Sequence, residues 1–203
     1  METVNNQINS FINIAFHELE NFSKHIDMQA LEKAKKIILD AEKQNKRVHV
    51  TGIGKPGHVA GYIASLLSST GTPAYELHGT EAVHGSSGQV LPGDVVIAIS
   101  NSGETSELKA TIETLIQNGA TIISVTGKKA SWLASKGEVT LIAGVEQEGD
   151  KMNKPPRASI LAEIMILQCL SILLQNEKHL NSSQYVKWHP GGSLGASIRK
   201  EGH

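Results

Sequence analysis

The sequence predicts a single α/β domain in three layers, with a parallel sheet between two layers of helices. Two observations lead to this fold class. Short segments that favour β structure alternate with helical patterns along most of the chain, which is typical of parallel strands joined by crossover helices. The chain also has 203 residues and 39% hydrophobic content, enough to bury one sizeable core, and its composition calls for no second domain.

Residues 1–46 predict two amphipathic helices, because apolar side chains recur there at helical spacing. The apolar positions are Ile8, Phe11, Ile12, Phe16 and Leu19 in the first helix, and Leu31, Ala34, Ile37, Ile38 and Ala41 in the second. Helices with one apolar face can pack against another subunit as well as against their own sheet.

Residues 47–203 are expected to hold the sheet and the remaining helices. Strands are predicted at 47–53, 73–77, 95–99, 121–126 and 139–143. Helices are predicted at 56–69, from the end of the third strand to about 117, near Trp132 and at 158–176. Doubly wound sheets bind ligands beyond the carboxyl ends of their strands, so functional motifs are expected at the strand-to-helix turns.

Charge and cysteine content exclude several classes of partner. The formal net charge is −1 and no polybasic run is present, so neither nucleic acid nor an anionic membrane surface is expected to bind. The one cysteine, Cys169, leaves no disulfide within the chain, which favours the cytoplasm. The N-terminus lacks the pattern of a secretory signal. The most apolar stretch, 160–174, is interrupted by Glu163 and is too short to span a membrane. A small molecule is the expected partner.

The stretch SNSGETS after the third strand predicts a phosphate site. It leaves a strand suited to a sheet interior and enters a helix, so free backbone N–H groups and the positive end of the helix dipole meet there. Ser100, Ser102 and Thr105 can add hydroxyl donors, while Gly103 lets the backbone approach a ligand closely.

A capping box is the alternative interpretation of this turn. Asn101 as N-cap and Glu104 three residues later would satisfy the donors of the helix start without a ligand. Capping explains one hydroxyl or amide, whereas this turn carries several, so phosphate binding is favoured.

The equivalent turn after the first strand, TGIGKPGH, places a lysine at the mouth of the sheet. Its glycine spacing matches neither a Walker A motif nor a dinucleotide-binding motif. Lys55 can pair with a phosphate or with a developing oxyanion; an ordinary exposed lysine is the alternative. The histidines His58, His78 and His84 raise the question of a metal, but no two have the i, i+4 spacing of a helical ligand pair. No metal and no cofactor are expected.

With these turns and the C-terminal HPGGSLG, the sequence resembles the sugar isomerase (SIS) domain and, within it, the arabinose 5-phosphate isomerase family. The matching segments are GIGKPGHVA, SSTGTPAYELHGTEAVHGSSG, PGDVVIAISNSGETSEL, ISVTG and HPGGSLG. Their order and spacing, from about Val48 to Gly195, are more specific than any one segment. The resemblance implies a flavodoxin-like fold with a five-stranded sheet, a homotetramer, and interconversion of an aldose phosphate and a ketose phosphate.

The resemblance also implies roles for individual residues. Those implied to bind the substrate or its phosphate are Gly54, Ser69, His84, Ser100, Asn101, Ser102 and Thr105. Those implied to be catalytic are Lys55, Glu107, Glu148 and His189. In the family such histidines can come from neighbouring subunits, so a complete site can require the oligomer. Aldose-ketose isomerisation needs an acid, a base and donors for an enediolate, and these residue types supply them.

Each catalytic role has a structural alternative. Glu107 can simply stabilise the first turn of a helix through the dipole. Glu148 can be an exposed loop acid, and His189 can be a helix cap. For His189 function is favoured, because it lies in a glycine-rich turn and loops carry functional residues more often than cores do.

Three departures from the family pattern stand out. Pro56 replaces the serine of the family's GKSGH turn and removes a backbone donor. The segment GDKMNKPPRASILAE, which contains Arg157, replaces a run rich in Ser and Thr. The sequence ends at residue 203, so paired regulatory CBS domains are not expected.

Two functions remain open from the sequence. One is an enzyme that isomerises a pentose phosphate, such as arabinose 5-phosphate to ribulose 5-phosphate, or another sugar phosphate such as a hexulose 6-phosphate. The other is a sensor of the same fold that binds a sugar phosphate without turnover, because fold alone does not establish catalysis.

Overall fold

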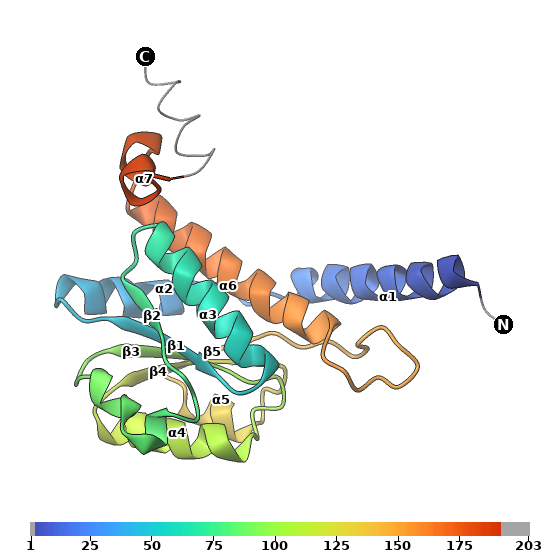
Figure 1. The fold of residues 1–203 in the computed structure, drawn as a ribbon, viewed down its shortest axis with the longest axis horizontal. Coiled ribbons are helices and arrows are strands. Elements are labelled where there is room, and N and C mark those ends of the chain that lie inside the picture. Colours follow the sequence, from blue (N-terminus) through green and yellow to red (C-terminus); the bar gives the residue numbers. More distant parts are fainter. Residues whose placement is uncertain (1–2, 192–203) are drawn as a thin grey trace.

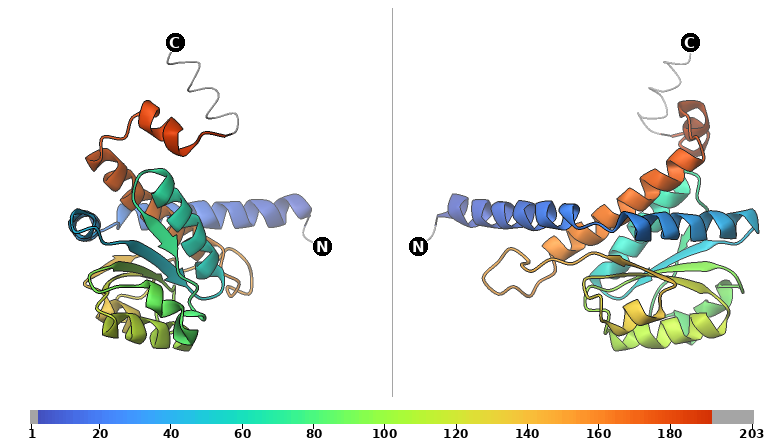
Figure 2. Two further views of the ribbon diagram at one scale, coloured as in Figure 1. Left: turned by 60° about the vertical axis from the view of Figure 1, so that its left-hand side comes forward. Right: turned by 180° about the vertical axis from the view of Figure 1, so that it is seen from behind.

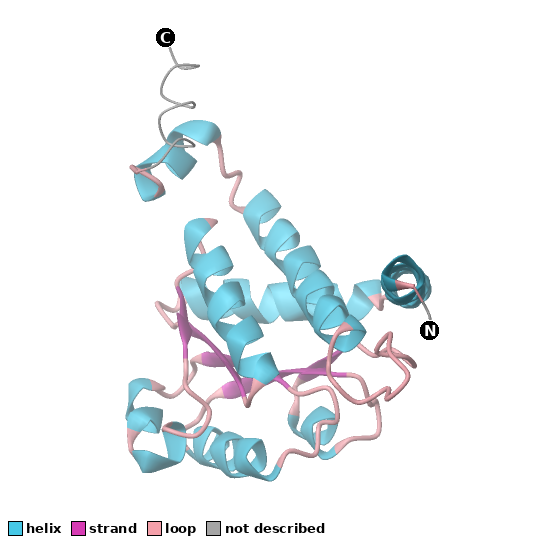
Figure 3. Cartoon of the chain, turned by 45° about the vertical axis from the view of Figure 1, so that its right-hand side comes forward, coloured by secondary structure: helices cyan, strands magenta, loops and turns pink. Residues whose placement is uncertain are grey.

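The sheet has five parallel strands in the order β2-β1-β3-β4-β5. The structure is a computed structural model that describes residues 3–191. The strands are β1 (Val48–Gly52), β2 (Ala74–Glu76), β3 (Val95–Ile99), β4 (Thr121–Thr126) and β5 (Val139–Ile142). They lie in the middle of the molecule with helices on either side (Figure 3). The predicted parallel sheet is confirmed.

Helices cover both faces of the sheet (Figure 1). One face is covered by α2 (Met28–Lys43), α3 (Lys55–Ser69) and α6 (Ala158–Glu177), and the other by α4 (Ser106–Gln117) and α5 (Trp132–Lys136). The three-layer α/β architecture is therefore as predicted. Elements that the sequence did not predict are the 3-10 turns η1 (Ala82–His84) and η2 (Ser86–Gln89) and the short helix α7 (Ser182–Trp188).

The first helix, α1 (Val4–Lys24), extends past the sheet beside the loop that precedes α6 (Figures 1 and 2). The buried carboxylate of Glu18 accepts a hydrogen bond from the N–H of Glu146 at 2.8 Å, which attaches the helix to this loop. Ile8 and Phe16 remain exposed, although they belong to the predicted apolar face. Only part of that face is used within the chain.

The uninterrupted apolar run of β3 follows from its position between two cores. All five residues of the strand are buried. Val95, Ile97 and Ile99 pack with residues of α2, α3 and α6, while Val96 and Ala98 pack with residues of α4 and α5. A parallel strand covered on both faces has no solvent side, so it needs no alternating polar residues.

Among the residues that the structure describes, α6 alone is long and apolar enough to match a membrane span by length and composition. Half of its most apolar window, 50%, is buried inside the protein. Its buried residues pack in the core formed with α2 and α3. A core helix of this kind accounts for the apolar composition.

Candidate functional site

The two motif turns begin side by side at the carboxyl end of the sheet. β1 and β3 are paired in register, with Gly52 opposite Ile99. The chain leaves β1 into α3 on one face of the sheet and leaves β3 into α4 on the other (Figure 1). This is a topological switch point, the place where doubly wound sheets bind ligands. The prediction that functional motifs gather at these turns is consistent with this arrangement.

The turn after β3 is held together by its own hydroxyl groups. Ser100 Oγ lies 3.2 Å from Thr105 Oγ1 and accepts a hydrogen bond from the N–H of Gly103 at 3.2 Å. Ser102 Oγ accepts a hydrogen bond from the N–H of Glu104 at 3.2 Å. The three hydroxyls predicted to bind phosphate therefore lie in one short turn.

Contacts with the loop after β4 set the shape of this turn. The backbone carbonyl of Asn101 accepts hydrogen bonds from the N–H of Gly127 at 3.0 Å and from Thr126 Oγ1 at 3.2 Å. Gly103 has a φ of 66°, and a Cβ at this position would lie 2.2 Å from Ser131 Oγ. Glycine is therefore required here both by the backbone conformation and by the lack of space.

The start of α4 presents donors that the protein leaves available. Thr105 is the N-cap residue, but its side chain makes no capping hydrogen bond. Within residues 3–191, the N–H groups of Ser106 and Leu108 have no acceptor. Amides at a helix N-terminus, together with the positive end of the dipole, form an anion site.

The capping-box interpretation is wrong for this turn. Asn101 is not the N-cap residue, since the helix is capped at Thr105. Glu104 does not reach back to the helix start: its Oε1 accepts a hydrogen bond from the N–H of Trp132 at 2.7 Å, and its Oε2 pairs with Lys109 Nζ at 2.6 Å. Glu104 instead ties the turn to the start of α5.

Glu107 lies in the first turn of α4 with an exposed side chain. Its carboxylate accepts hydrogen bonds from its own backbone N–H and from Ser106 Oγ, the latter at 2.9 Å. These bonds hold the pKa of Glu107 below its ordinary value. The carboxylate is therefore ionised at neutral pH, as its position at a helix N-terminus favours.

The turn after β1 places Lys55 at the first position of α3. Gly54 is the N-cap residue, with φ of 66° and ψ of −129°, a backbone conformation that suits glycine. Lys55 itself is exposed and borders a hollow of about 320 Å³ between α3 and α6. The remaining lining residues are His58, Val59 and Tyr62 of α3 and Pro156, Ile160 and Ile164 at the start of α6. Lys55 therefore faces the end of α6 that also holds Glu148.

Glu148 is buried, so its interpretation as an exposed loop acid is wrong. Its Oε2 accepts hydrogen bonds from the N–H of Arg157 at 2.6 Å and from the N–H of Ser159 at 3.1 Å. The backbone N–H of Glu148 donates to Asn153 Oδ1 at 2.6 Å, which folds the loop. The carboxylate therefore caps α6 through one oxygen, and the described residues leave Oε1 available.

His189 and Ser69 lie at the other end of α6, away from Glu148. His189 follows α7 as its C-cap residue, stacks on the Tyr185 ring at 3.9 Å between centroids, and has Nδ1 3.0 Å from Tyr185 O. Ser69 ends α3, and its hydroxyl donates to Leu66 O at 2.8 Å. Within one chain the structure therefore does not bring Ser69 to the turn after β3, and its role in the phosphate pocket stays a prediction.

The length of α6 shows that Glu148 and His189 lie far apart in one chain. Its 20 residues span about 30 Å, because an α-helix rises about 1.5 Å per residue. Glu148 caps the first end, and His189 lies beyond the second. Side chains cannot bridge this distance, so the structure does not bring His189 and Glu148 together in one chain.

The histidines do not gather around one point. His58 and His78 line a pocket of about 150 Å³ between the turns after β1 and β2, which Gly54 also lines. His78 Nδ1 lies 3.1 Å from Thr80 Oγ1. His84 is exposed on η1 and is not among the residues that line this pocket. Across residues 3–191, no three His, Cys, Asp or Glu side chains are placed to share a metal ion.

Sequence reasoning missed Glu163 as a candidate residue. It is fully buried in α6, and neither carboxyl oxygen has a hydrogen-bond partner within the described residues. Burial, and then the charge of Glu148, raise the pKa of Glu163 to about 8. The sequence contained one signal: an acid that interrupts the most apolar stretch of the chain.

Comparisons with known proteins agree with the resemblance that the motifs predict. A family model described as SIS domain matches residues 43–173. The chain is 35% identical over 195 residues to the arabinose 5-phosphate isomerase KdsD of Francisella tularensis, covering 96% of this chain and 59% of that protein. It is 41% identical over 152 residues to KdsD of Pseudomonas aeruginosa, covering 75% of this chain and 47% of that protein. The chain thus spans about half the length of the curated relatives it matches.

A solved structure matches over nearly the whole fold. This is a protein of Escherichia coli CFT073 in complex with arabinose 5-phosphate, at a TM-score of 0.84 and 31% sequence identity. The match covers 90% of this chain and 95% of the other. The three-layer fold is therefore shared, over most of its length, with a known structure that has a ligand bound.

Proposed function

Because this chain belongs to the SIS domain family, we propose that it is a cytoplasmic phosphosugar isomerase that interconverts D-arabinose 5-phosphate and D-ribulose 5-phosphate. Relatives at 35% and 41% identity are named arabinose 5-phosphate isomerases, and a solved relative is a complex with arabinose 5-phosphate. The observation that carries the proposal is the switch point between β1 and β3, where an anion site and a lysine stand on adjacent turns.

The phosphate of the substrate binds the turn after β3 in this proposal. The free N–H groups of Ser106 and Leu108 and the hydroxyls of Ser100, Ser102 and Thr105 supply donors. The turn contains no Lys or Arg, so charge neutralisation comes from the helix dipole and the amides. A monophosphate suits such a site.

The isomerisation uses Glu148 as the base. Its Oε2 is fixed by two amides, and Oε1 takes the proton from carbon 2 of the aldose phosphate. Lys55 stabilises the negative charge of the enediolate that forms. His189 transfers a proton between the oxygens on carbons 1 and 2, and the proton on Glu148 then returns to carbon 1, giving the ketose phosphate.

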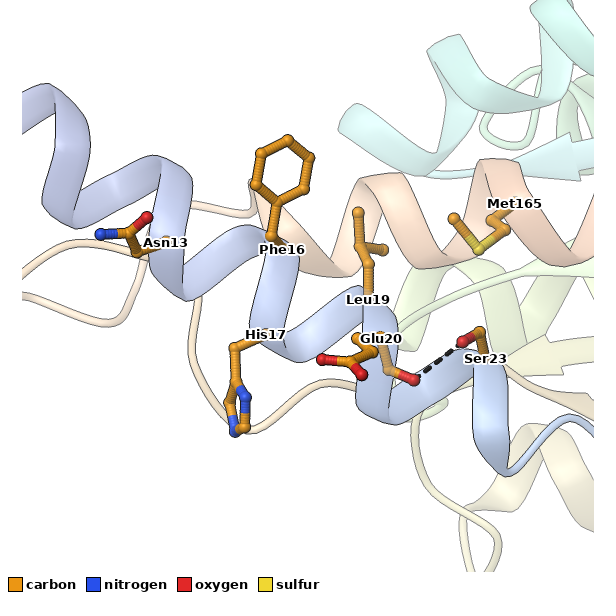
Figure 4. A pocket seen from close by; sticks show the side chains of 7 residues that line it. All are labelled: Asn13, Phe16, His17, Leu19, Glu20, Ser23 and Met165. Atoms are coloured by element: carbon orange, nitrogen blue, oxygen red, sulfur yellow. Dashed lines mark hydrogen bonds between the residues drawn. The ribbon is translucent and has the colours of Figure 1, made fainter.

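The site is completed across a subunit boundary in this proposal, within a homotetramer. Helix α6, about 30 Å long, separates His189 from Glu148 in one chain, so a neighbouring chain must supply one of them. α1 offers apolar surface for that association: Phe16 is 68% exposed and projects from the helix, with Leu19 and Met165 nearby on α1 and α6 (Figure 4). Exposed apolar side chains on a helix face are typical of an oligomer contact.

The first experiment follows the reaction itself. Purified protein is incubated with ribulose 5-phosphate in deuterated water, and products are followed by NMR. Arabinose 5-phosphate with deuterium at carbon 2 is expected, since the base exchanges its proton with solvent. Binding without product from any sugar phosphate in a panel of pentose and hexulose phosphates would refute isomerase activity.

Variants test the roles of the proposed catalytic residues. Glu148→Gln is expected to abolish turnover and keep sugar phosphate binding, while Glu146→Gln, the same change at an exposed acid of the same loop, is expected to keep turnover. His189→Ala is expected to be inactive as well. Mixed oligomers of Glu148→Gln and His189→Ala chains are expected to regain activity, because some sites then receive both intact residues. No regain on mixing would contradict a shared site.

A second candidate function is a sensor that binds a sugar phosphate without turning it over. The observation that favours it is the hydrogen bonding of Glu148, whose Oε2 already has a structural role as the cap of α6. A sensor predicts that Glu148→Gln lowers stability, has no effect on chemistry, and leaves phosphate affinity unchanged. The turnover experiment separates the two functions.

A further inference from the structure

The first two turns of α6 bury two polar side chains that find no partner. Ser159 and Glu163 are both 0% exposed. Within the described part of the chain, Ser159 Oγ and both carboxyl oxygens of Glu163 have no hydrogen-bond partner. Burying a polar group without a partner is unfavourable, and burying an ionised one is far more so. A packing role alone would be served better by an apolar residue.

Ser159 and Glu163 follow the helix start that Glu148 caps. Ser159 and Glu163 are separated by four positions, so they occupy the same face of α6 on successive turns. The N–H of Ser159 donates to Glu148 Oε2. The order Glu148, Ser159, Glu163 therefore runs from the loop into the core along one side of the helix.

Burial and the surrounding charges favour the neutral form of Glu163. The charge of Glu148 acts on Glu163, and together with burial it favours the protonated form of Glu163. Two backbone hydrogen bonds, from the N–H groups of Arg157 and Ser159, hold the Glu148 carboxylate at the start of α6. Among the described residues, the titratable and charged groups that neighbouring elements bring to this end of α6 include Lys55 and His58 of α3, Glu18 of α1, and the ion pair of Arg157 with Asp150. The α2 lysine that pairs near α6, Lys35, does so with Glu177 at the opposite end.

We infer that Glu163 is a positioning residue for Glu148, and that the two carboxyl groups form a pair that carries one negative charge in the working enzyme. This inference rests on the proposed function, in which Glu148 is the base. Protonated Glu163 leaves Glu148 as the one ionised member, fixed on its two amides. Ionisation of Glu163 adds a second negative charge behind Glu148, repels its carboxylate from the helix start and moves it out of position.

The test compares pH profiles of kcat in three proteins. Wild type is expected to lose activity as the pH rises through about 8, where Glu163 ionises. Glu163→Gln has nearly the same shape and cannot ionise, so it is expected to stay within about threefold of wild type at pH 7 and to keep its activity about one pH unit further into the alkaline range. Glu146→Gln, the exposed control, is expected to keep the wild-type profile.

A second variant and a second measurement guard against misfolding. Glu163→Met is neutral, similar in length and suited to a core, so it is expected to show the same alkaline extension if Glu163→Gln fails to fold. Difference infrared spectra of wild type between pH 6 and pH 10 are expected to show the loss of one protonated carboxyl band that is absent from both variants. Neither the alkaline shift of kcat nor the infrared band depends on how tightly the substrate binds.

The outcomes distinguish the inference from the proposed function. Turnover with an unchanged alkaline fall in the folded variants would overturn the role of Glu163 and leave the isomerase intact. Absence of turnover by wild type would overturn the proposed function and the positioning role together. An alkaline extension in the variants with the infrared band confined to wild type would establish the shared charge.

Discussion

Replacing Gly103 by alanine tests whether the turn after β3 is as tightly built as its contacts indicate. The backbone at Gly103 has a φ of 66°, and adopting this conformation with a Cβ costs about 1–2 kcal/mol. The added carbon would also lie 2.2 Å from Ser131 Oγ and 2.9 Å from Thr126 Oγ1, so both side chains must move. Forcing a group into a packed site costs about 1–3 kcal/mol. Gly103→Ala is therefore expected to lower the free energy of unfolding by about 2–5 kcal/mol.

The assay is urea denaturation at fixed pH, where a change in midpoint at constant slope reports the change in stability. Gly85→Ala is the control: Gly85 also has a left-handed backbone, with φ of 115°, but a Cβ there would meet nothing within 4 Å. It is expected to lose only the backbone contribution of about 1–2 kcal/mol. Equal losses in the two variants would refute the claim that Ser131 and Thr126 crowd the turn.

Three further changes test other parts of the structure. Ser100→Ala is expected to weaken sugar phosphate binding about tenfold in calorimetry, as one hydrogen bond to a charged group is worth about 1.5 kcal/mol; unchanged affinity would remove this hydroxyl from the site. Lys178→Met is expected to cost about 3 kcal/mol in urea denaturation, because Lys178 pairs with Glu42 at 2.7 Å and is only 19% exposed. The exposed Lys33, changed in the same way, should have little effect. The pKa of Glu163 is raised from 4.5 to about 8, so the folded state binds more protons than the unfolded state between these values and stability falls as pH rises. Relative to Glu163→Gln, wild type is expected to lose about 5 kcal/mol between pH 4.5 and 8, whereas parallel stability curves would contradict a neutral buried carboxyl.

The sheet and its long helices could be predicted because their signals are local. The apolar run at 95–99 and the helical spacing of the N-terminal apolar residues each fall inside one element. α7 has only seven residues and η1 only three, too few for a periodic pattern to emerge. These elements depend on contacts made after the chain has folded, such as the packing of Trp188 on Gly71.

Some residues of the candidate site could likewise be predicted from local sequence, and others could not. The turn after β3 could be predicted because strand, glycine, hydroxyls and helix start all lie within a dozen residues, and the fold places that turn at the switch point. Glu163 could not, because the sequence shows an acid in an apolar stretch without saying which face of α6 is buried. Packing of α6 against α1, α2 and α3 decides its burial.

The positions of His189 and Ser69 show what a motif match leaves open. A match assigns a residue type to a place in the order of the chain, but it carries no information on which subunit delivers the side chain. α6 separates the two ends, with Glu148 and Lys55 at one and His189, near the end of α3, at the other. If Glu148, Lys55 and His189 serve one reaction, the rigid helix requires chains to associate with the end of one α6 near the beginning of another. In that case a single chain contains the whole phosphate turn, but its acid-base groups lie in two different sites. Oligomer formation then affects turnover more strongly than it affects phosphate binding.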